Sequence, residues 1–422
     1  MPEVTVTGLG AAGDGLARLP DGTPCFVAGG LPGERLAVRV TERRRGAARA
    51  EIAAVLAPSP ARALPPCRHF AEGCGGCAVQ HLAAAEAAAW KRDSVAEALR
   101  RGGFADPVVA ATATSPPRSR RRADLALRRG PGGVAAGFHR RGSGAVLDLV
   151  QCEVLDPRLF ALLAPLRALL RDLPALRREG SAVLNLLDTG ADLLLRTDGA
   201  LEAEGRAALA DFAAAHGLPR IAWARGDGPP EPAAQLGPVS IALGGVAVAP
   251  PPGAFLQATP EGEAAILGAV LAGLPERLPG KARIADLYAG LGTLSFPLAG
   301  AARVAAFEGS AEAVAALSAA AGRAGARVAA TRRDLARQPL TPAELAGFAA
   351  VVLDPPFAGA AEQIAPLARA RVPRVIYVSC NPAALTRDAR ALAAAGYRLV
   401  SATPVDQFLW SAQVEAVAVF AV

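Results

Sequence analysis

Lysine is almost absent from this chain of 422 residues. Only Lys91 and Lys281 occur, so 43 of the 45 basic residues are arginine. Abundant alanine, glycine and proline accompany this bias, which is typical of a GC-rich coding sequence. The number of arginines therefore indicates little by itself, and the net charge of +7 gains meaning only where arginines cluster.

Long apolar runs are also missing. Hydrophobic residues make up 52% of the chain, but many of them are alanine. The chain contains no apolar run of about 20 residues that is free of charges and helix breakers, so no segment looks like a membrane-spanning helix. The opening residues, MPEVTVTG, show no basic segment followed by an apolar one, as a secretory signal would. We therefore expect a soluble, cytoplasmic protein with no membrane association, and we expect a monomer.

Arginines do cluster in one window, residues 115–141. It contains eight arginines and a single acid, Asp124, so its net charge of +7 equals that of the whole chain. Arg120, Arg121 and Arg122 are consecutive within it. Such a basic strip suits the phosphate backbone of a nucleic acid, and the alternative is an ordinary solvated face.

Cysteines form a second cluster. Cys67, Cys74 and Cys77 lie close together, and Gly75-Gly76 lets the chain turn so that two of these thiols face one centre. Cys152 is the natural fourth ligand, and four thiolates suit zinc or an iron–sulfur cluster. Spacing does not choose between these metals, and free thiols are the third alternative.

The chain divides into three predicted domains. Residues 1–57 alternate in short runs separated by glycine-rich turns, which predicts a small all-β, OB-like barrel. Two stretches in it, VTVTGLGAAGDGLA and GLPGERLAVRV, resemble the TRAM domain, an RNA-binding barrel. A proline-rich linker follows at residues 57–66. We interpret residues 58–245 as a central α+β domain that holds the metal.

Residues 246–422 alternate between strand and helix patterns, which predicts a parallel, doubly wound α/β sheet. Strand 283–288 leads into the turn Ala289-Gly290-Leu291-Gly292-Thr293. Glu308 closes the next strand, where an acid can accept hydrogen bonds from ribose hydroxyls. Because no third phosphate-binding glycine follows, the pattern indicates an S-adenosylmethionine site more than a dinucleotide site.

Cys380 follows the buried strand pattern Val375–Ser379, and Asn381-Pro382 ends that strand. It should therefore lie at the carboxyl edge of the sheet, where such folds bind their ligands. The plainer interpretation is a small buried hydrophobe. Glu415, between valines and alanines of the last strand pattern, is either exposed at an edge or functional.

Together these motifs resemble the uracil-C5 RNA methyltransferases, in order and over nearly the whole chain. The matching residues are the four cysteines, Arg120–Arg122, Phe255-Leu256-Gln257, Asp286–Gly292, Glu308, Asp354-Pro355-Pro356, Ser379-Cys380-Asn381-Pro382 and Glu415. The chain departs from the family's common residues at Ala289, Thr293 and Thr259. The resemblance implies a Rossmann-like class I methyltransferase domain and a [4Fe–4S] cluster on Cys67, Cys74, Cys77 and Cys152, with zinc less favoured. Members with both the barrel and the cluster typically modify 23S rRNA, and the tRNA branch is the alternative.

The resemblance also implies roles. Cys380 would add to C6 of the uracil, and Glu415 would remove the C5 proton. We expect the site to favour the Cys380 thiolate. The arginine strip and the barrel would grip RNA. The cofactor-binding residues would be Gln257, Tyr288, Thr293, Glu308, Asp334 and Asp354. Two rivals remain: methylation of an exocyclic amine by Asp354-Pro355-Pro356-Phe357, and a non-catalytic RNA-binding iron–sulfur protein.

Overall fold

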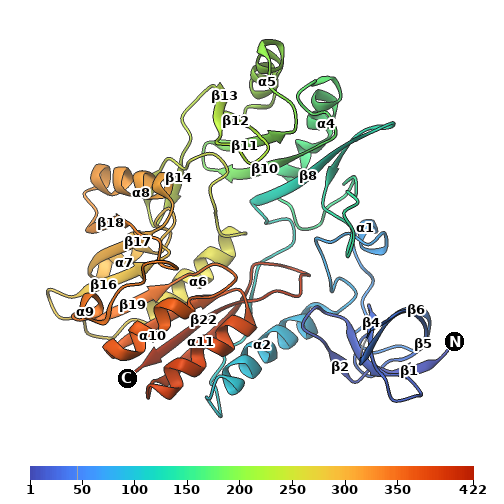
Figure 1. Cartoon of the computed structure of the whole chain (residues 1–422), viewed down its shortest axis with the longest axis horizontal. Helices are drawn as coiled ribbons and strands as arrows, with labels where there is room; N and C mark the ends of the chain where they lie inside the picture. Colours follow the sequence, from blue (N-terminus) through green and yellow to red (C-terminus); the bar gives the residue numbers. More distant parts are fainter. Residues whose placement is uncertain (45) are drawn as a thin grey trace.

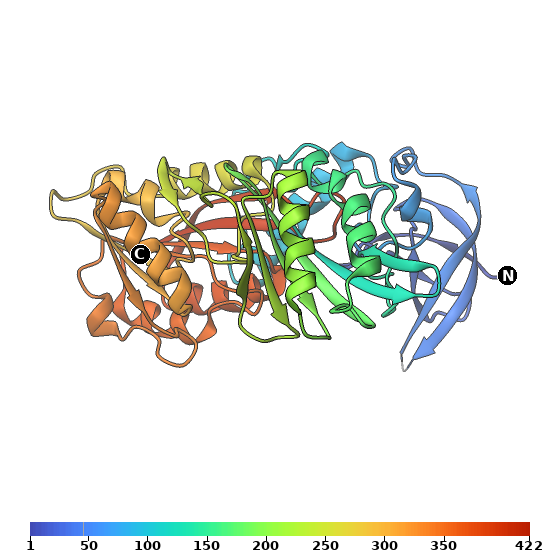
Figure 2. The ribbon, with the colours of Figure 1, turned by 90° about the horizontal axis from the view of Figure 1, so that it is seen from above.

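A computed structural model describes residues 1–44 and 46–422 of the chain. Three large sheets organise it (Figure 1). Seen from above, the N-terminal sheet lies at one end of an elongated molecule and the C-terminal sheet at the other (Figure 2). Within the described ranges, no helix is both long and apolar enough to cross a membrane.

The N-terminal barrel is a six-stranded sheet in the order β1-β5-β6-β4-β3-β2. Alternate residues such as Leu36 and Val38 are buried, while the residues between them face outward. This confirms the predicted all-β fold. The strands are β1 (Glu3–Thr5), β2 (Gly8–Leu9), β3 (Gly15–Arg18), β4 (Pro24–Ala28), β5 (Arg35–Arg44) and β6 (Ala47–Ala57).

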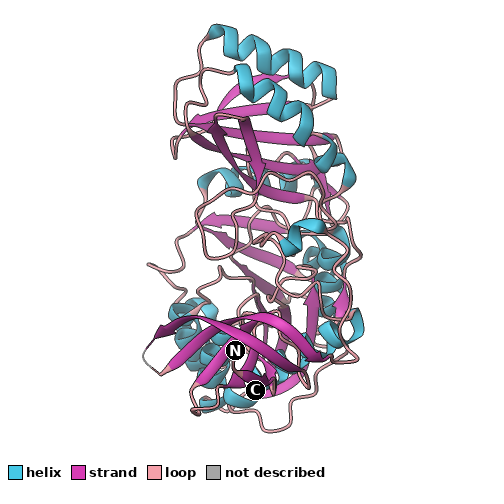
Figure 3. Cartoon of the chain, turned by 90° about the vertical axis from the view of Figure 1, so that its right-hand side faces the viewer, coloured by secondary structure: helices cyan, strands magenta, loops and turns pink. Residues whose placement is uncertain are grey.

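The central sheet runs β13-β12-β11-β10-β8-β9, and helices α4 and α5 lie on one face of it (Figure 3). Leucines from both layers form its core. Residues 157–172 form two helices, because the chain turns at Leu162. The elements are α1 (Arg68–Ala71), α2 (Ala84–Arg101), β7 (Ala113–Thr114), β8 (Arg122–Gly130), β9 (Gly133–Gly137), α3 (Pro157–Ala161), α4 (Leu163–Asp172), β10 (Glu179–Leu187), β11 (Gly190–Thr197), α5 (Ala203–His216), β12 (Arg220–Arg225) and β13 (Glu231–Gln235).

The C-terminal sheet has the order β18-β17-β16-β19-β20-β22-β21-β7. The first five strands are parallel, and β22 inserts antiparallel between β20 and β21. The elements are β14 (Ile241–Leu243), β15 (Val246–Val248), α6 (Pro260–Ala272), β16 (Arg283–Leu287), α7 (Ser295–Ala301), β17 (Arg303–Glu308), α8 (Ala311–Ala324), β18 (Val328–Arg332), α9 (Pro342–Leu345), β19 (Ala350–Leu353), α10 (Ala361–Ala370), β20 (Arg374–Ser379), α11 (Pro382–Ala394), β21 (Arg398–Asp406) and β22 (Glu415–Ala421).

Two elements from the predicted central domain pack with the C-terminal sheet. Helix α2 packs against α11, and β7 pairs with the outer strand β21 (Figure 1). The domain limits drawn from the sequence therefore do not follow the packing in this region. One consequence is that the segment after the cysteine motif reaches the C-terminal sheet directly.

Candidate active site and RNA-facing surfaces

Cys380 lies where the sequence pattern placed it, between β20 and helix α11. Asn381 caps that helix, because its side chain accepts a hydrogen bond from the Ala383 amide at 3.0 Å. The Asn381 side-chain amide donates to the Phe357 carbonyl at 2.9 Å. Cys380 is thereby fixed next to the loop that follows β19, at the carboxyl edge of the parallel strands.

A chain of buried side chains runs beside this cysteine. Gln407 Nε2 donates to Glu415 Oε2 at 3.0 Å and to Gln257 Oε1 at 2.7 Å. Gln257 Nε2 in turn donates to Asp354 Oδ2 at 2.9 Å. The structure thus brings Gln257, Asp354 and Glu415 together. Gln407 was missed because nothing in its sequence context distinguishes it from other glutamines.

The charges in this site oppose one another. Burial raises the pKa of Glu415 and of Asp354, and the Asp354 carboxylate raises the pKa of Glu415 further. Burial, followed by the charges of Glu415 and Asp354, raises the pKa of Cys380 to about 12. The expectation that the site favours the thiolate is therefore wrong for the ligand-free protein, because burial and the neighbouring carboxylates both disfavour the anion.

The turn after β16 has the geometry of a ligand cradle. Tyr288 has φ +64°, a backbone conformation that is costly for a residue with a side chain. Gly290 also has positive φ, and the space where a Cβ would stand is open. Asp286, before this turn, is buried and accepts a 2.5 Å bond from Ser295, while its Oδ1 has no partner among the described residues. Burial raises the pKa of Asp286 to about 7.

The other predicted cofactor residues follow neighbouring strands. Glu308 accepts hydrogen bonds from the Gly290 amide at 2.9 Å and the Ser310 amide at 2.7 Å, so its carboxylate is fixed beside the cradle. Thr293 is half-buried on the same turn. Asp334 lies beyond β18 and is exposed, and it accepts hydrogen bonds from nearby backbone amides.

The four predicted metal ligands all line one small pocket. Burial and the neighbouring thiols raise the pKa of Cys77 to about 12. His69 is used otherwise, since it bonds to Glu72 and to the Val150 amide. In the described part of the chain, no group of three or more His, Cys, Asp or Glu side chains is arranged to hold a metal ion. The pocket therefore gathers four thiol groups from two distant segments of the chain.

Comparisons with known proteins identify the family. A TRAM domain model matches residues 2–53, and a tRNA (uracil-5-)-methyltransferase model matches residues 279–421. An uncharacterized RNA methyltransferase of Caulobacter vibrioides is 42% identical over 100% of both chains. A 23S rRNA (uracil(1939)-C(5))-methyltransferase of Chromohalobacter salexigens is 37% identical over 98% of this chain and 87% of its own. The chain belongs to the RNA (uracil-5-)-methyltransferase family.

A solved structure shares the whole fold of this methyltransferase. The tRNA (uracil-54, C5)-methyltransferase of Pyrococcus abyssi, in complex with S-adenosyl-L-homocysteine, superposes with a TM-score of 0.75. The match covers 99% of this chain and 100% of the other, at 21% identity. The fold is therefore that of a class I methyltransferase preceded by a TRAM domain, and S-adenosylmethionine is the family's methyl donor.

The arginine strip of this methyltransferase is not a uniform basic face. Arg121 is 8% exposed, pairs with Glu263 at 2.5 Å and donates to the Gln257 carbonyl, so it supports the active site from inside. The RNA contact predicted for Arg121 therefore does not fit its position. Arg120 and Arg122 are half-buried, and the Arg122 guanidinium lies 5.5 Å from the ring of Phe255, which is largely exposed.

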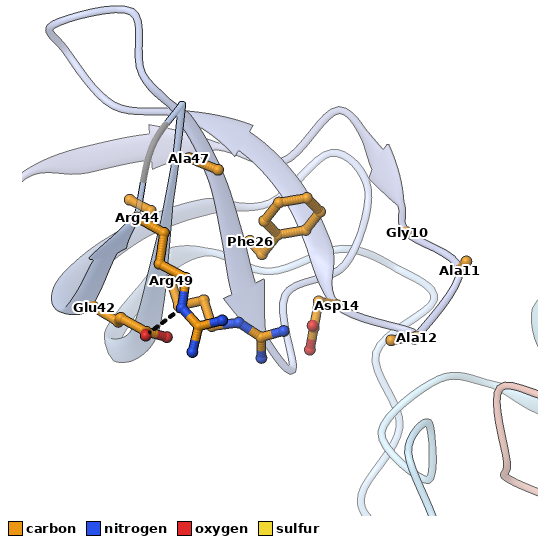
Figure 4. Close-up of a pocket in the computed structure, with 10 residues that line it drawn as sticks. Gly10, Ala11, Ala12, Asp14, Phe26, Glu42, Arg44, Ala47 and Arg49 are labelled. Atoms are coloured by element: carbon orange, nitrogen blue, oxygen red, sulfur yellow. Dashed lines mark hydrogen bonds and ion pairs between the residues drawn. The ribbon is translucent and has the colours of Figure 1, made fainter. Parts of the chain in front are cut away.

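The barrel carries a second feature suited to RNA. A pocket of about 370 Å³ opens beside the exposed ring of Phe26 on β4, and the side chains of Arg44 and Arg49 lie below that ring (Figure 4). The segment from Gly10 to Asp14 forms another wall. An aromatic face with adjacent guanidinium groups is a suitable surface for an unpaired base and its phosphate.

Proposed function

We propose that this methyltransferase modifies C5 of a uridine in 23S rRNA, through a covalent bond between Cys380 and C6 of the base. The observation that carries the proposal is the chain of Glu415, Gln407, Gln257 and Asp354 beside Cys380. The relative named as a 23S rRNA enzyme supports the choice of RNA. Methylation of tRNA by the same chemistry is the second candidate, in line with the solved structure, but at 21% identity that likeness concerns the fold alone.

The residues around β16 and β17 fit S-adenosylmethionine. Asp286 has a buried oxygen without a described partner, Gly290 leaves open space, and Glu308 stands at the end of the neighbouring strand. When bound, this cofactor supplies an electrophilic methyl group on a positively charged sulfur. Tyr288 and Thr293 on the turn would contact it, and Asp334 would do so from the strand beyond.

The proposed reaction needs a nucleophile and a base. The Cys380 thiolate adds to C6, the electron pair of the C5–C6 bond makes C5 nucleophilic, and C5 takes the methyl group. Glu415 then removes the C5 proton, the C5–C6 double bond re-forms, and Cys380 leaves as thiolate. Asp354, held by Gln257, would orient the uracil edge. The target base has to leave its stack to reach Cys380.

Loss of the Cys380 proton is the step that the ligand-free site opposes. Burial keeps the thiol protonated, and ionisation of Glu415 or Asp354 raises its pKa further. Because Glu415 also has a raised pKa, it is largely protonated near neutral pH and its charge is then absent. We infer that thiolate forms only after RNA and cofactor fill the site and change this charge balance.

We further propose that Cys67, Cys74, Cys77 and Cys152 hold a [4Fe–4S] cluster. Support comes from the four thiols that line one pocket and from the resemblance of this cysteine pattern to that of the family. Zinc remains the second candidate. The cluster would supply structural support for the chain around it, since the proposed methylation has no redox step.

Methylation of an exocyclic amine by Asp354-Pro355-Pro356-Phe357 is less favoured. Phe357 is 57% exposed and could stack on a base, but that chemistry gives Cys380 and Glu415 no role. Membership of the uracil-5 family also favours carbon over nitrogen.

The decisive experiment uses RNA that carries 5-fluorouridine. Fluorine cannot leave as a proton does, so Cys380 should stay bonded to the RNA in the presence of S-adenosylmethionine. We expect a denaturant-resistant complex with a 23S rRNA fragment and none with Cys380→Ser. Mapping of the trapped nucleotide identifies the uridine, and a tRNA transcript tests the second candidate. Methylation of natural RNA without any trapped complex would contradict the covalent mechanism.

A further inference from the structure

Glu415, the proposed base, directly follows a short loop that contacts helix α2, the cysteine motif and the barrel. Residues 408–414 join β21 to β22, and Gln407 and Glu415 stand at the two ends of this 408–414 loop. Glu415 pairs across the sheet with Val405. The loop therefore joins the two strand ends that carry the amide of Gln407 and the carboxylate of Glu415.

Lys91 of helix α2 holds the beginning of this loop. Its ammonium is 1% exposed and donates to Asp406 Oδ1 at 2.5 Å and to the Phe408 carbonyl at 3.2 Å. It is one of only two lysines in a chain with 43 arginines, and it is fully buried, whereas Lys281 is exposed. A compact ammonium with three donors fits a site where the larger, planar guanidinium does not.

The cysteine motif holds the middle of the loop. The Trp410 carbonyl accepts hydrogen bonds from the Ala78 amide at 2.7 Å and the Val79 amide at 2.9 Å. Trp410 has φ +59°, so the loop keeps a costly backbone conformation in which this carbonyl meets both amides. Ala78 follows Cys77 directly. The pocket of four thiols and the proposed base are therefore joined through two backbone amides and one loop.

The barrel meets the same point. A Cβ added to Gly13 would lie 2.7 Å from the Val79 side chain and 3.9 Å from Ala412, so the barrel, the cysteine motif and the 408–414 loop are packed together. The Gly10–Asp14 segment that contains Gly13 also lines the Phe26 pocket. A single junction thus connects the surface suited to RNA with the segment that carries Glu415.

We propose that Lys91 and the Ala78–Val79 backbone are positioning elements that hold Glu415 where it can remove the C5 proton. The inference rests on the proposed function. It assigns the cysteine motif a mechanical role in a reaction without a redox step. Bond formation at C6 and methyl transfer need Cys380, which lies between β20 and α11 and not on this loop. Loosening the loop should therefore slow product release selectively and leave covalent addition much less affected.

The test compares Lys91→Met with Lys281→Met, which removes the other lysine of the chain, an exposed one. With natural uridine RNA, Lys91→Met should slow the release of methylated RNA by roughly tenfold to a hundredfold, the range that small misplacements of a catalytic group produce. The covalent RNA adduct should then accumulate on a denaturing gel, as it should with Glu415→Gln. The dissociation constants for RNA and S-adenosylhomocysteine should stay near the wild-type values.

Amide hydrogen exchange provides a readout that needs no RNA. We expect faster exchange in residues 408–414 of Lys91→Met and no change in Lys281→Met. This separates two failures: wild-type enzyme that forms no C6 adduct refutes the proposed function, whereas unchanged exchange in this loop refutes the positioning role. A folded Lys91→Met protein that releases RNA at the wild-type rate, or that slows addition and release equally, also overturns the inference.

A double variant separates position from buried charge. Loss of Lys91 alone leaves Asp406 uncompensated, which can unfold the protein. In Lys91→Met/Asp406→Leu neither charge remains, but the Phe408 carbonyl still lacks its donor. Adduct accumulation in this folded double variant supports the positioning role. Restoration of wild-type release would mean that the ion pair serves stability alone, and the inference would fail.

Discussion

At the residue scale, the candidate site holds three acidic groups, Cys380, Glu415 and Asp354, whose surroundings disfavour negative charge. Glu415 is buried, and Cys380 and Asp354 are half-buried. Burial raises all three pKa values, the charge of Asp354 raises that of Glu415, and both carboxylates raise that of Cys380. The ligand-free protein therefore keeps protons on groups that have to lose them during the reaction.

Alkylation of Cys380 measures this directly. With its pKa raised to about 12, Cys380 should react with iodoacetamide far more slowly at pH 8 than an ordinary thiol, and its rate should still rise with pH above 9. Because the pKa of Glu415 is raised to about 8, Glu415→Gln removes a negative charge above that pH, so it should lower the pKa of Cys380 and speed alkylation at about pH 9.5. Peptide mapping isolates Cys380 from the other cysteines. An unchanged pH profile in the variant would contradict the proposed proximity of the two charges.

Asp286 offers a pH-dependent stability test. Its pKa is raised from 3.8 to about 7 by burial, so the folded state favours the protonated acid. The stability it contributes is present below pH 3.8 and is lost as the pH rises towards 7. Asp286→Asn stays neutral, so it should stabilise the ligand-free protein at pH 8 by on the order of 4 kcal/mol, and by less at pH 5. Thermal unfolding at both pH values checks this, with the exposed Asp211→Asn as control, and a gain independent of pH would refute it.

At the element scale, much of the fold followed from the sequence. The strand predicted at 283–288 ends at Leu287, and Cys380 follows β20 as its Asn-Pro turn indicated. These elements were readable because buried parallel strands are continuous apolar runs. The packing of helix α2 against the C-terminal sheet could not be predicted, because an amphipathic pattern does not say which partner covers the apolar face of the helix. The roles of Gln407 and Lys91 could not be predicted either, because they depend on tertiary contacts.

The cysteine motif permits a matched test at this scale. Cys152 comes from the segment after β9, far along the chain from Cys77, yet lines the same pocket, whereas Cys25 is buried in the barrel core. If the pocket holds a [4Fe–4S] cluster, protein prepared without oxygen should be brown and contain about four irons per chain. Cys152→Ser should lower the iron content strongly, and Cys25→Ser should not. One zinc per chain in colourless protein would favour the second candidate instead.

At the scale of the whole molecule, the barrel and the C-terminal sheet lie at opposite ends of an elongated molecule (Figure 2). The 408–414 loop of the C-terminal sheet reaches the barrel, where Ala412 lies close to Gly13. A folded RNA that is long enough to extend from Cys380 to the barrel would contact both. The arginine strip contributes less to this surface than its charge suggested, because several of its guanidinium groups are used within the protein. Arg129, for example, donates to four backbone carbonyls.

The barrel pocket should therefore contribute to RNA affinity independently of the chemistry. Phe26 is 37% exposed beside Arg49, and stacking of one base on such a ring contributes about 1–3 kcal/mol. Phe26→Ala should weaken RNA binding by about 5- to 150-fold without changing its salt dependence, because no charge is lost. Arg49→Gln should reduce that salt dependence instead. Leu236→Ala, which removes an exposed apolar side chain outside both surfaces, should leave affinity unchanged. Full affinity in Phe26→Ala would mean that RNA approaches the active site without using the pocket, and it would limit the RNA-binding surface to the neighbourhood of Arg122 and Phe255.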